Sequence, residues 1–529
     1  MWNTDWRDRV WDRLDEPWDI VVVGGGITGA GILREAVRSG LRTLLIDSGD
    51  FASGTSSRSS KLVHGGFRYL RDAKLRLTLV SVRERETLMQ QGRGLVTPLG
   101  FLLANFKGDK IPAWVFGAGL IVYDLMGLQW GHQHYGPDDL QALCPPLAAE
   151  NLTGGFRYFD AQTDDARLTL RVIREAVAEG GLALNYARAE GLLKPRSGPV
   201  CGVQVVDQAP GGERRSAEVR ARIVINATGA WADDLRQEVG AVKRMRKLRG
   251  SHLVLDNQSL ALNRAVTFLH PQDGRPVFAL PWEGVTLFGT TDVDQDQPLE
   301  GEPRISPGEV DYLLTALREV FPASDLSERD VRATFAGVRG VIDTGKKDPS
   351  RESREHVLWH ENGLVTVTGG KLTTFRVMAH DALRSIRHRL PEGTGLRGMD
   401  RILNPPPSER CMPTGLDGAT CQRLLGRYGV ETSAMLAHAK SDDFEKIGEG
   451  PYTWLELRYA AREEGIIRLD DLLLRRLRLG ITLPNGALDQ IDRIRSTAQP
   501  ELGWDDTRWE AELSRYQRLW DSSYRLRDD

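Results

Sequence analysis

The sequence predicts an α/β fold made of a Rossmann-like dinucleotide-binding domain, a capping α+β domain and an all-helical C-terminal domain. Two observations carry this prediction. Near the N-terminus a β-branched run leads into a glycine-rich turn, a helix and a second strand, the order of a dinucleotide-binding unit. Beyond the Pro405-Pro406-Pro407 run, charged segments carry leucines at helical spacing, such as Leu469, Leu472, Leu473 and Leu477, and at 529 residues the chain has room for two or three domains.

The N-terminal unit is expected to begin with a strand at Asp19–Val23, whose continuous β-branched residues are typical of a buried parallel strand. The strand runs into Gly24-Gly25-Gly26-Ile27-Thr28-Gly29, which satisfies G-x-G-x-x-G, and a helix is expected over 30–38. A second strand over 42–46 ends at Asp47, where a carboxylate can accept a ribose hydroxyl. The glycines allow a tight turn and let a pyrophosphate reach backbone N–H groups at the helix N-terminus.

Two distant segments repeat the pattern of a buried strand followed by a glycine turn. One strand at 222–226 runs into Ala227-Thr228-Gly229, and another at 364–367 runs into Thr368-Gly369-Gly370-Lys371, with a helical stretch from Thr373. A dinucleotide touched by three scattered segments is permanently enclosed, which favours FAD over an exchangeable NAD. The alternative is that these are ordinary turns of the sheet.

The loop after Asp47 is rich in hydroxyl groups and glycine, and with it a family resemblance becomes specific. SSKLVHGGFRYL (59–70), FDAQTDDARL (159–168), RGSHLVL (249–255), GTTD (289–292), AGVR (336–339), GGKLTTFR (369–376) and a helical run over 457–480 resemble the FAD-dependent glycerol-3-phosphate dehydrogenases of the D-amino-acid oxidase-like superfamily. The resemblance covers about residues 18–485, in order. Two departures, Gly92-Arg93-Gly94 and Gly340, leave the local loop shape and fine substrate preference open.

The resemblance implies oxidation of sn-glycerol 3-phosphate to dihydroxyacetone phosphate, with hydride leaving C2 for the flavin N5. It implies catalytic roles for His252, Arg339 and Lys371, and substrate contacts from Arg68, Tyr69, Arg275 and Arg339. Cofactor contacts are expected at Gly24, Gly26, Ile27, Thr28, Gly29, Asp47, Thr55, Ser56, Ser60, Lys61, Leu62, His64, Gly66, Thr228, Gly229, Gly370, Lys371, Leu372 and Thr373.

These candidate residues suit the chemistry, because arginine matches phosphate geometry and imidazole titrates near neutral pH. His252 is the leading candidate for the base that takes the hydroxyl proton, although a buried core histidine is the alternative reading. Lys371 can stabilise negative charge on the reduced flavin ring together with the helix N-terminus. Asp160, Asp164 and Asp165 lack metal-ligand spacing, so we interpret them as structural and expect no metal.

The cofactor domain is expected to be discontinuous, over 1–90, 150–245 and 330–390. The capping domain is expected over 91–149 and 246–329, with an antiparallel sheet around 251–255, 277–280 and 286–289. The helical domain is expected over 391–529, with packing or oligomerisation as its role; a homodimer is left open.

Composition excludes some function classes. Lys plus Arg (70) nearly balance Asp plus Glu (73), leaving a net charge of -3, so nucleic acid is not an expected partner. The four cysteines are far apart and are expected to be reduced, buried thiols. Residues 1–18 lack the apolar core of a secretory signal, and the apolar stretch at 111–128 is expected to be a buried helix.

The leading hypothesis is an enzyme that passes electrons to a membrane quinone, from the cytoplasm at the inner face of the cell membrane. An oxidase that uses oxygen and a non-catalytic flavoprotein are the alternatives. A quinone acceptor requires peripheral membrane contact, and two anchors are considered. One is an amphipathic N-terminal helix with Trp6, Val10 and Leu14; the other is the cluster Arg475, Arg476 and Arg478, which also reads as the solvated face of a helix.

Overall fold

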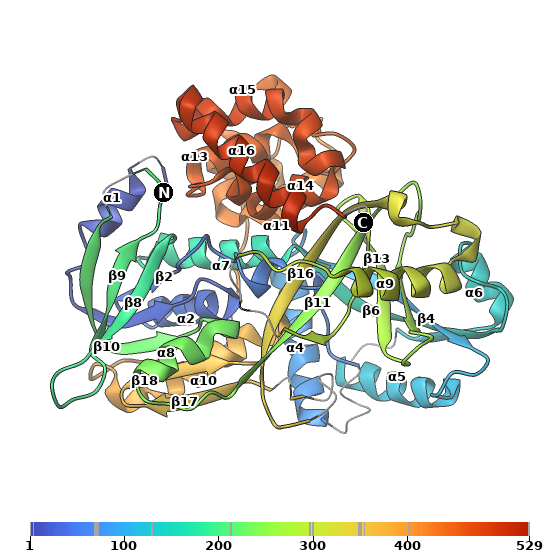
Figure 1. Cartoon of the computed structure of the whole chain (residues 1–529), viewed down its shortest axis with the longest axis horizontal. Coiled ribbons are helices and arrows are strands. Elements are labelled where there is room, and N and C mark those ends of the chain that lie inside the picture. The colour runs from blue at the N-terminus through green and yellow to red at the C-terminus, as the bar shows by residue number, and fades with distance from the viewer. Residues whose placement is uncertain are drawn as a thin grey trace.

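The structure, a computed structural model, describes residues 2–3, 5–67, 74–127, 131–211, 214–295, 298, 301–346, 352–353, 355–399, 401–413 and 415–526. Two sheets lie side by side, and helices α11–α16 gather above them (Figure 1). The α/β fold with a helical C-terminal domain is therefore confirmed.

The first sheet is mostly parallel and contains the expected nucleotide-binding unit. Strand β1 pairs in parallel with β2 and β10, and β10 pairs in parallel with β18. The strand order is β17 (Val357–Glu361), β18 (Leu364–Thr368), β10 (Ser216–Asn226), β1 (Trp18–Val23), β2 (Thr43–Ile46) and β7 (Leu182–Leu184), with β8 (Ala187–Leu193) and β9 (Gly202–Asp207) joined through β10.

The second sheet is largely antiparallel and forms the other wall of the molecule. Its order is β15 (Val293–Asp294), β11 (Met245–Asp256), β14 (Val285–Gly289), β13 (Pro276–Trp282), β12 (Ala265–Leu269), β4 (Val96–Phe106), β6 (Leu152–Thr163) and β3 (Leu62–Val63), with β16 (Val331–Ile342) on β11 and β5 (Gln133–Tyr135) on β6. The predicted antiparallel strands are confirmed as β11, β13 and β14.

Helices cover both sheets and build the C-terminal domain. Those before residue 390 are α1 (Trp6–Trp11), α2 (Ile27–Arg38), α4 (Leu75–Gln91), α5 (Ala113–Gly127), α6 (Pro137–Leu143), α7 (Asp165–Ala178), α8 (Ala232–Glu238), α9 (Pro307–Val320) and α10 (Phe375–Ser385). The later ones are α11 (Gly418–Tyr428), α12 (Thr432–Leu436), α13 (Trp454–Glu463), α14 (Leu479–Thr482), α15 (Ile491–Leu502) and α16 (Asp506–Ser523), with a π-helical turn at Asp471–Arg476.

Helix α2 begins three residues earlier than the sequence indicated, because Gly26 already has the extended backbone of an N-cap. Gly29 therefore lies in the first turn, close to the glycine loop. A Cβ on Gly29 would lie 1.9 Å from the Gly24 carbonyl oxygen, so the third glycine of the fingerprint permits the close packing of helix and strand.

Sheet membership does not coincide with the expected domain ranges. Strands β6 and β16 fall within the ranges expected for the cofactor domain, yet both pair within the second sheet. The helical domain also shares a core with that sheet, because Phe101 and Trp282 cluster with Leu469, Leu472 and Trp509. The chain thus crosses repeatedly between its two sheets, and this places the loops of both around one cavity.

Both proposed membrane anchors are buried. Trp6, Val10 and Leu14 belong to the main core. Trp6 and Val10 lie on helix α1, which ends at Trp11, and Leu14 follows it. The arginine cluster is wrong as a solvated or lipid-facing surface. Its members are at most 3% exposed and pair with buried carboxylates, which are Asp50, Asp164, Asp165, Asp470 and Asp471.

Residues 113–127 of the apolar stretch form helix α5, but the expected burial is wrong. Trp114 is 73% exposed and Leu125 is 62% exposed. Within the described part of the chain, no helix combines the length and apolarity needed to cross a membrane. Of the cysteines, Cys144 is a buried free thiol, whereas Cys201 and Cys421 are free thiols that are partly exposed.

Candidate active site

A cavity of about 2520 Å³ is lined by residues of both sheets. Pockets for drug-sized ligands measure about 300–1,000 Å³, so this cavity has room for a dinucleotide and a small substrate together. It is bordered by the carboxyl ends of parallel strands β1, β2, β10 and β18, where open α/β sheets bind ligands.

The glycine loop after β1 forms one end of the cavity. Gly24, Gly26, Ile27 and Thr28 line it, and Gly24 has φ of +114°, with the space for its Cβ filled by the Ala227 carbonyl at 2.6 Å. The Ser56 hydroxyl accepts a hydrogen bond from the Ile27 N–H at 2.9 Å. Because backbone N–H groups at the start of a helix bind anions, this end suits a pyrophosphate.

Asp47 lies beside the same loop at the end of β2. Its carboxylate accepts hydrogen bonds from the Gly25 N–H at 2.6 Å and the Gly49 N–H at 2.9 Å. Burial raises the pKa of Asp47 to about 6. The side chain therefore borders the glycine turn at the position expected for a ribose contact.

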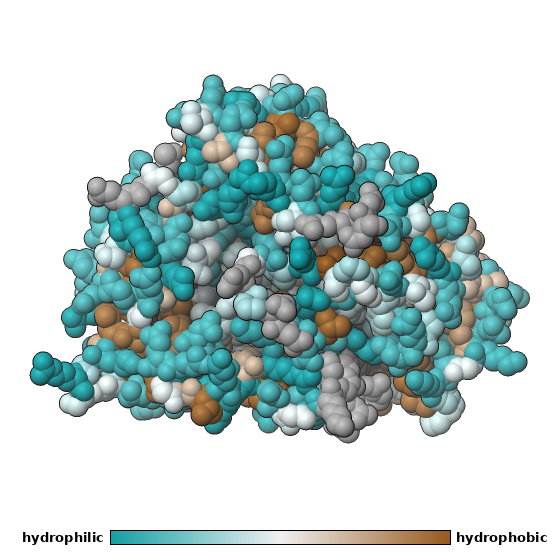
Figure 2. Space-filling model, viewed as in Figure 1, coloured by the Kyte–Doolittle hydropathy of each residue, from teal (hydrophilic) through white to brown (hydrophobic). Residues whose placement is uncertain are grey.

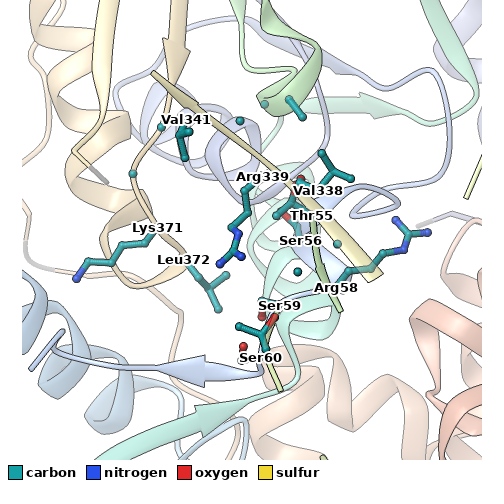
Figure 3. Close-up of a pocket in the computed structure, with 18 of the residues that line it drawn as sticks. Thr55, Ser56, Arg58, Ser59, Ser60, Val338, Arg339, Val341, Lys371 and Leu372 are labelled. Atoms are coloured by element: carbon teal, nitrogen blue, oxygen red, sulfur yellow. The ribbon is translucent and has the colours of Figure 1, made fainter. Parts of the chain in front are cut away.

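The two other glycine segments meet the first. Thr228, Gly229, Gly370, Lys371, Leu372 and Thr373 all line the cavity, as do Thr55, Ser56, Ser60, Leu62 and His64 of the hydroxyl-rich loop. Figure 3 shows the Arg339 side chain between that loop on one side and Lys371 with Leu372 on the other. Three segments spread over some 350 residues of sequence thus line one cavity.

Three expected cofactor contacts, Gly29, Lys61 and Gly66, are not among the lining residues. Lys61 is fully buried beneath the loop, where its ammonium group lies 2.9 Å from Asp165 and donates to the Ser57 carbonyl at 2.6 Å. Lys61 therefore anchors the hydroxyl-rich loop from the interior of the protein. This contact, with those of Arg478 and Arg427 to Asp164, also places both aspartates in a buried ion network, in keeping with the structural interpretation.

His252 lies on β11 in the wall of the cavity, between β14 and β16. Its Nε2 and the Ser60 hydroxyl oxygen are 2.8 Å apart and hydrogen-bonded, and its ring stacks on Phe335. A Cβ on Gly289 would lie 2.5 Å from the ring, so this glycine makes room for the imidazole. Burial, with help from the charges of Lys61 and Arg339, lowers the pKa of His252 well below its usual value, so the imidazole is neutral at pH 7.

Arg275, just before β13, and Arg339, on β16, both line the cavity and share one carboxylate. Asp292, 2% exposed, lies 3.0 Å from Arg339 and 3.6 Å from Arg275. A Cβ on Gly250 would lie 2.7 Å from the Arg339 guanidinium. Two cations against one buried anion leave a net positive charge, which suits a phosphate dianion. The other expected substrate residues, Arg68 and Tyr69, lie outside the described residues.

Lys371 completes the site at the turn before α10. Burial lowers the pKa of its ammonium group to about 7, against an opposing effect of Asp160. Asp160 itself lines the cavity and accepts hydrogen bonds from Arg85 at 2.7 Å and from the Gly65 N–H at 3.0 Å. The hydrogen bond from Gly65 holds the start of the turn at His64-Gly65-Gly66 in place.

Sequence reasoning missed the role of Asp292 and the bond between Ser60 and His252. Asp292 closes the GTTD motif, so its presence was visible, but nothing in the sequence states that it joins Arg275, just before β13, to Arg339 on β16. Ser60 was expected as a cofactor contact only. Strand register places His252 opposite Gly289 and Phe335, and the hydroxyl-rich loop brings Ser60 to the same ring.

Comparisons with known proteins agree with this geometry. Residues 19–376 match the model of the FAD dependent oxidoreductase family, and residues 379–509 match that of the C-terminal domain of alpha-glycerophosphate oxidase. The aerobic glycerol-3-phosphate dehydrogenase of Staphylococcus aureus (strain USA300) is 33% identical over 490 residues, covering 88% of this chain and 87% of the relative.

Solved structures give the same picture. The glycerol-3-phosphate dehydrogenase from Bacillus halodurans, complexed with FAD, aligns with a TM-score of 0.80 at 28% identity, over 99% of this chain and 98% of that one. The L-alpha-glycerophosphate oxidase from Mycoplasma pneumoniae shares the fold, with a TM-score of 0.57 at 20% identity over 72% of this chain and 97% of that one.

The cavity residues fit FAD, because the glycine loop offers N–H groups to a pyrophosphate and two further turns close around the volume that a flavin needs. The cradle, the cavity and these similarities agree, and the chain belongs to the FAD-dependent oxidoreductases and, within them, to the FAD-dependent glycerol-3-phosphate dehydrogenases.

Proposed function

We propose that this protein oxidises sn-glycerol 3-phosphate to dihydroxyacetone phosphate and passes the electrons to a membrane quinone. The observation that carries the proposal is the placement of His252, Arg275, Arg339 and Lys371 around one cavity that also contains the glycine cradle. When bound, FAD supplies the acceptor for the hydride that leaves C2. The protein must then bind the phosphate, orient C2 and accept the hydroxyl proton.

Phosphate binding is assigned to Arg275 and Arg339. Asp292 holds both guanidinium groups in place, so the cations are positioned before the substrate arrives. Such preorganisation reduces the cost of ordering long side chains upon binding. Arg68 and Tyr69 are retained as further substrate contacts in the proposal, on the resemblance alone.

His252 is assigned as the base. Its lowered pKa keeps the ring neutral and able to take the C2 hydroxyl proton as the C–O bond becomes a carbonyl. Ser60 and the stacked Phe335 hold the ring in orientation. Lys371 is assigned to stabilising negative charge that develops on the cofactor side, since its pKa of about 7 allows it to become fully charged beside an anion.

The acceptor is the finer part of the proposal. A quinone acceptor places the protein in the cytoplasm at the inner face of the cell membrane, as a peripheral protein. An oxidase that reduces oxygen is the second candidate, and it is favoured by the match of residues 379–509 to the C-terminal domain of alpha-glycerophosphate oxidase.

Two-step mixing separates these functions. The holoenzyme is first reduced anaerobically with sn-glycerol 3-phosphate, and flavin absorbance is followed. We expect complete bleaching, and no bleaching would refute the proposed substrate. The reduced enzyme is then mixed with a water-soluble quinone or with oxygen: faster reoxidation by quinone supports the dehydrogenase, and equal or faster reoxidation by oxygen supports the oxidase.

A further inference from the structure

Exposed apolar side chains concentrate on one helix. The described part of the chain exposes nine large apolar side chains, and five of them lie on α5. A sixth, Leu75, lies at the start of α4, which packs against α5. The face shown in Figure 2 is mainly hydrophilic, with apolar side chains gathered in a few places. A contiguous exposed patch of this kind marks an interaction surface.

Helix α5 presents two adjacent apolar stripes. Val115, Ala118 and Val122 line the cavity, so this stripe forms part of its wall. Trp114, Ile121 and Leu125 follow the neighbouring stripe at helical spacing; they do not line the cavity and are 73%, 42% and 62% exposed. Helix α5 therefore directs one apolar stripe toward the cavity and the adjacent apolar stripe toward the surroundings of the protein.

Charged side chains lie near helix α5, but its outer stripe contains none. Asp124, the only Asp, Glu, Lys, Arg or His among residues 113–127, is turned inward, where it accepts hydrogen bonds from the Gly131 and His132 N–H groups at 2.9 and 3.0 Å. Lys107 and Lys110 are exposed just before the helix, and Arg76 is exposed on α4. The acid between the lysines, Asp109, is partly buried and accepts from the Phe106 N–H.

The size and chemistry of the exposed surface of α5 indicate which kind of partner binds it. A stable protein interface takes about 20–30 residues a side, whereas this patch is confined to one helix of 15 residues and the start of α4. A helix of 15 residues is about 22 Å long, which is too short to cross a bilayer. An apolar stripe with a tryptophan and flanking cations suits a helix that lies in the plane of a membrane surface.

We propose that α5 is the membrane-docking surface of this protein, with Trp114, Ile121 and Leu125 inserted at the lipid interface and Lys107, Lys110 and Arg76 at the level of anionic headgroups. This inference rests on the proposed function, because it explains how a lipid-soluble acceptor reaches the cavity. The inner stripe then borders the path from the hydrocarbon region to the flavin.

The test is flotation of the holoenzyme with vesicles of phosphatidylglycerol and phosphatidylethanolamine, and with vesicles of phosphatidylcholine. The variant Trp114→Asp/Leu125→Asp is compared with Val242→Asp/Val430→Asp. The control changes two exposed apolar side chains away from α5, 67% and 45% exposed, and adds the same charge. Bound FAD and Tm are measured to show that both variants fold.

We expect the wild type and the control to float and the α5 variant to partition at least about tenfold less with both kinds of vesicle. Reduction of a water-soluble quinone should be equal in all three proteins. Equal flotation of both variants, or no flotation of the wild type, overturns the proposal. So does a shift from dimer to monomer in the α5 variant with vesicle binding retained, which identifies a second copy as the occupant.

Failure of the proposed function gives a different result. If the soluble quinone is not reduced while flotation behaves as expected, the acceptor is wrong and the docking surface stands. If a less apolar pair such as Trp114→Ser/Leu125→Ser reproduces the loss of flotation, repulsion by the introduced aspartates is excluded as its cause.

Discussion

Replacing Arg339 by alanine should identify the phosphate site. The guanidinium lies 3.0 Å from Asp292 at the end of a cavity wall, with its side chain 28% exposed. Losing one partner of a buried charge pair costs about 2–5 kcal/mol. Partial exposure and the second cation, Arg275, argue for the lower half of that range, about 2–3 kcal/mol, which corresponds to a fall in kcat/KM of roughly 30- to 150-fold.

The assay is steady-state oxidation of sn-glycerol 3-phosphate with a soluble dye as acceptor, repeated with glycerol. Glycerol lacks the phosphate, so Arg339→Ala should have almost no effect on its slow oxidation. Arg339→Lys should recover part of the loss, because it restores the charge without the planar fork. As a control, Arg246→Ala removes another arginine that pairs with an aspartate, Asp294, and neither of these two residues lines the cavity. If Arg339→Ala slows both substrates equally, the arginine does not bind phosphate.

Three further predictions follow from the buried charges. His252→Gln should slow anaerobic flavin reduction by about 10²- to 10⁴-fold with little change in substrate affinity, while the wild-type rate should stay flat as the pH falls through 6.5, because the histidine pKa is lowered; an acid limb centred near 6.5 contradicts this. Because the Lys371 pKa falls to about 7 from 10.5, the folded apoprotein binds fewer protons than the unfolded chain between these values and gains stability as pH rises, so Lys371→Met should raise the apoprotein Tm more at pH 7 than at pH 9.5; an equal change at both refutes the shift. Arg478→Met removes one partner from each of two buried carboxylates, Asp164 and Asp165, which keep Arg427 and Lys61. It should lower the free energy of unfolding in urea by about 3 kcal/mol, the lower end of the cost of breaking a buried ion pair, against under about 1 kcal/mol for the exposed Arg220→Met; similar midpoints for the two variants would show that the network contributes little.

The nucleotide-binding half could be predicted because its information is local. The run from Asp19 to Asp47 specifies a strand, a turn with a required positive φ at Gly24, a helix and a second strand, each from neighbouring residues. The ends of strands β10 and β18 were equally readable, because parallel strands bring their glycine turns to the same edge of the sheet.

The substrate side was less readable because it depends on pairing between distant strands. Arg275 and Arg339 were found individually, through the resemblance, but their common partner Asp292 follows only from the register of β11 with β14, β15 and β16. The same pairing places Phe335 on His252, whereas Ser60 reaches the ring from the distant hydroxyl-rich loop. A sequence states which side chains are available, whereas their mutual distances are decided by the sheet.

Two predictions of burial are wrong in opposite directions, and both errors have the same cause. The arginines at 475, 476 and 478 looked like a solvated face, yet they are buried because loops more than 300 residues earlier supply Asp50, Asp164 and Asp165. Helix α5 looked like a core element, yet its outer stripe faces away from the protein. Hydropathy indicates whether a segment can be buried at low cost, but the residues that pack against the segment decide whether it is buried. The arginine cluster pairs with carboxylates inside the protein and joins the helical domain to the cofactor loop. Helix α5 packs against α4 and β6, but its outer stripe stays exposed within the described chain, which is the physical basis for assigning that stripe to a lipid surface.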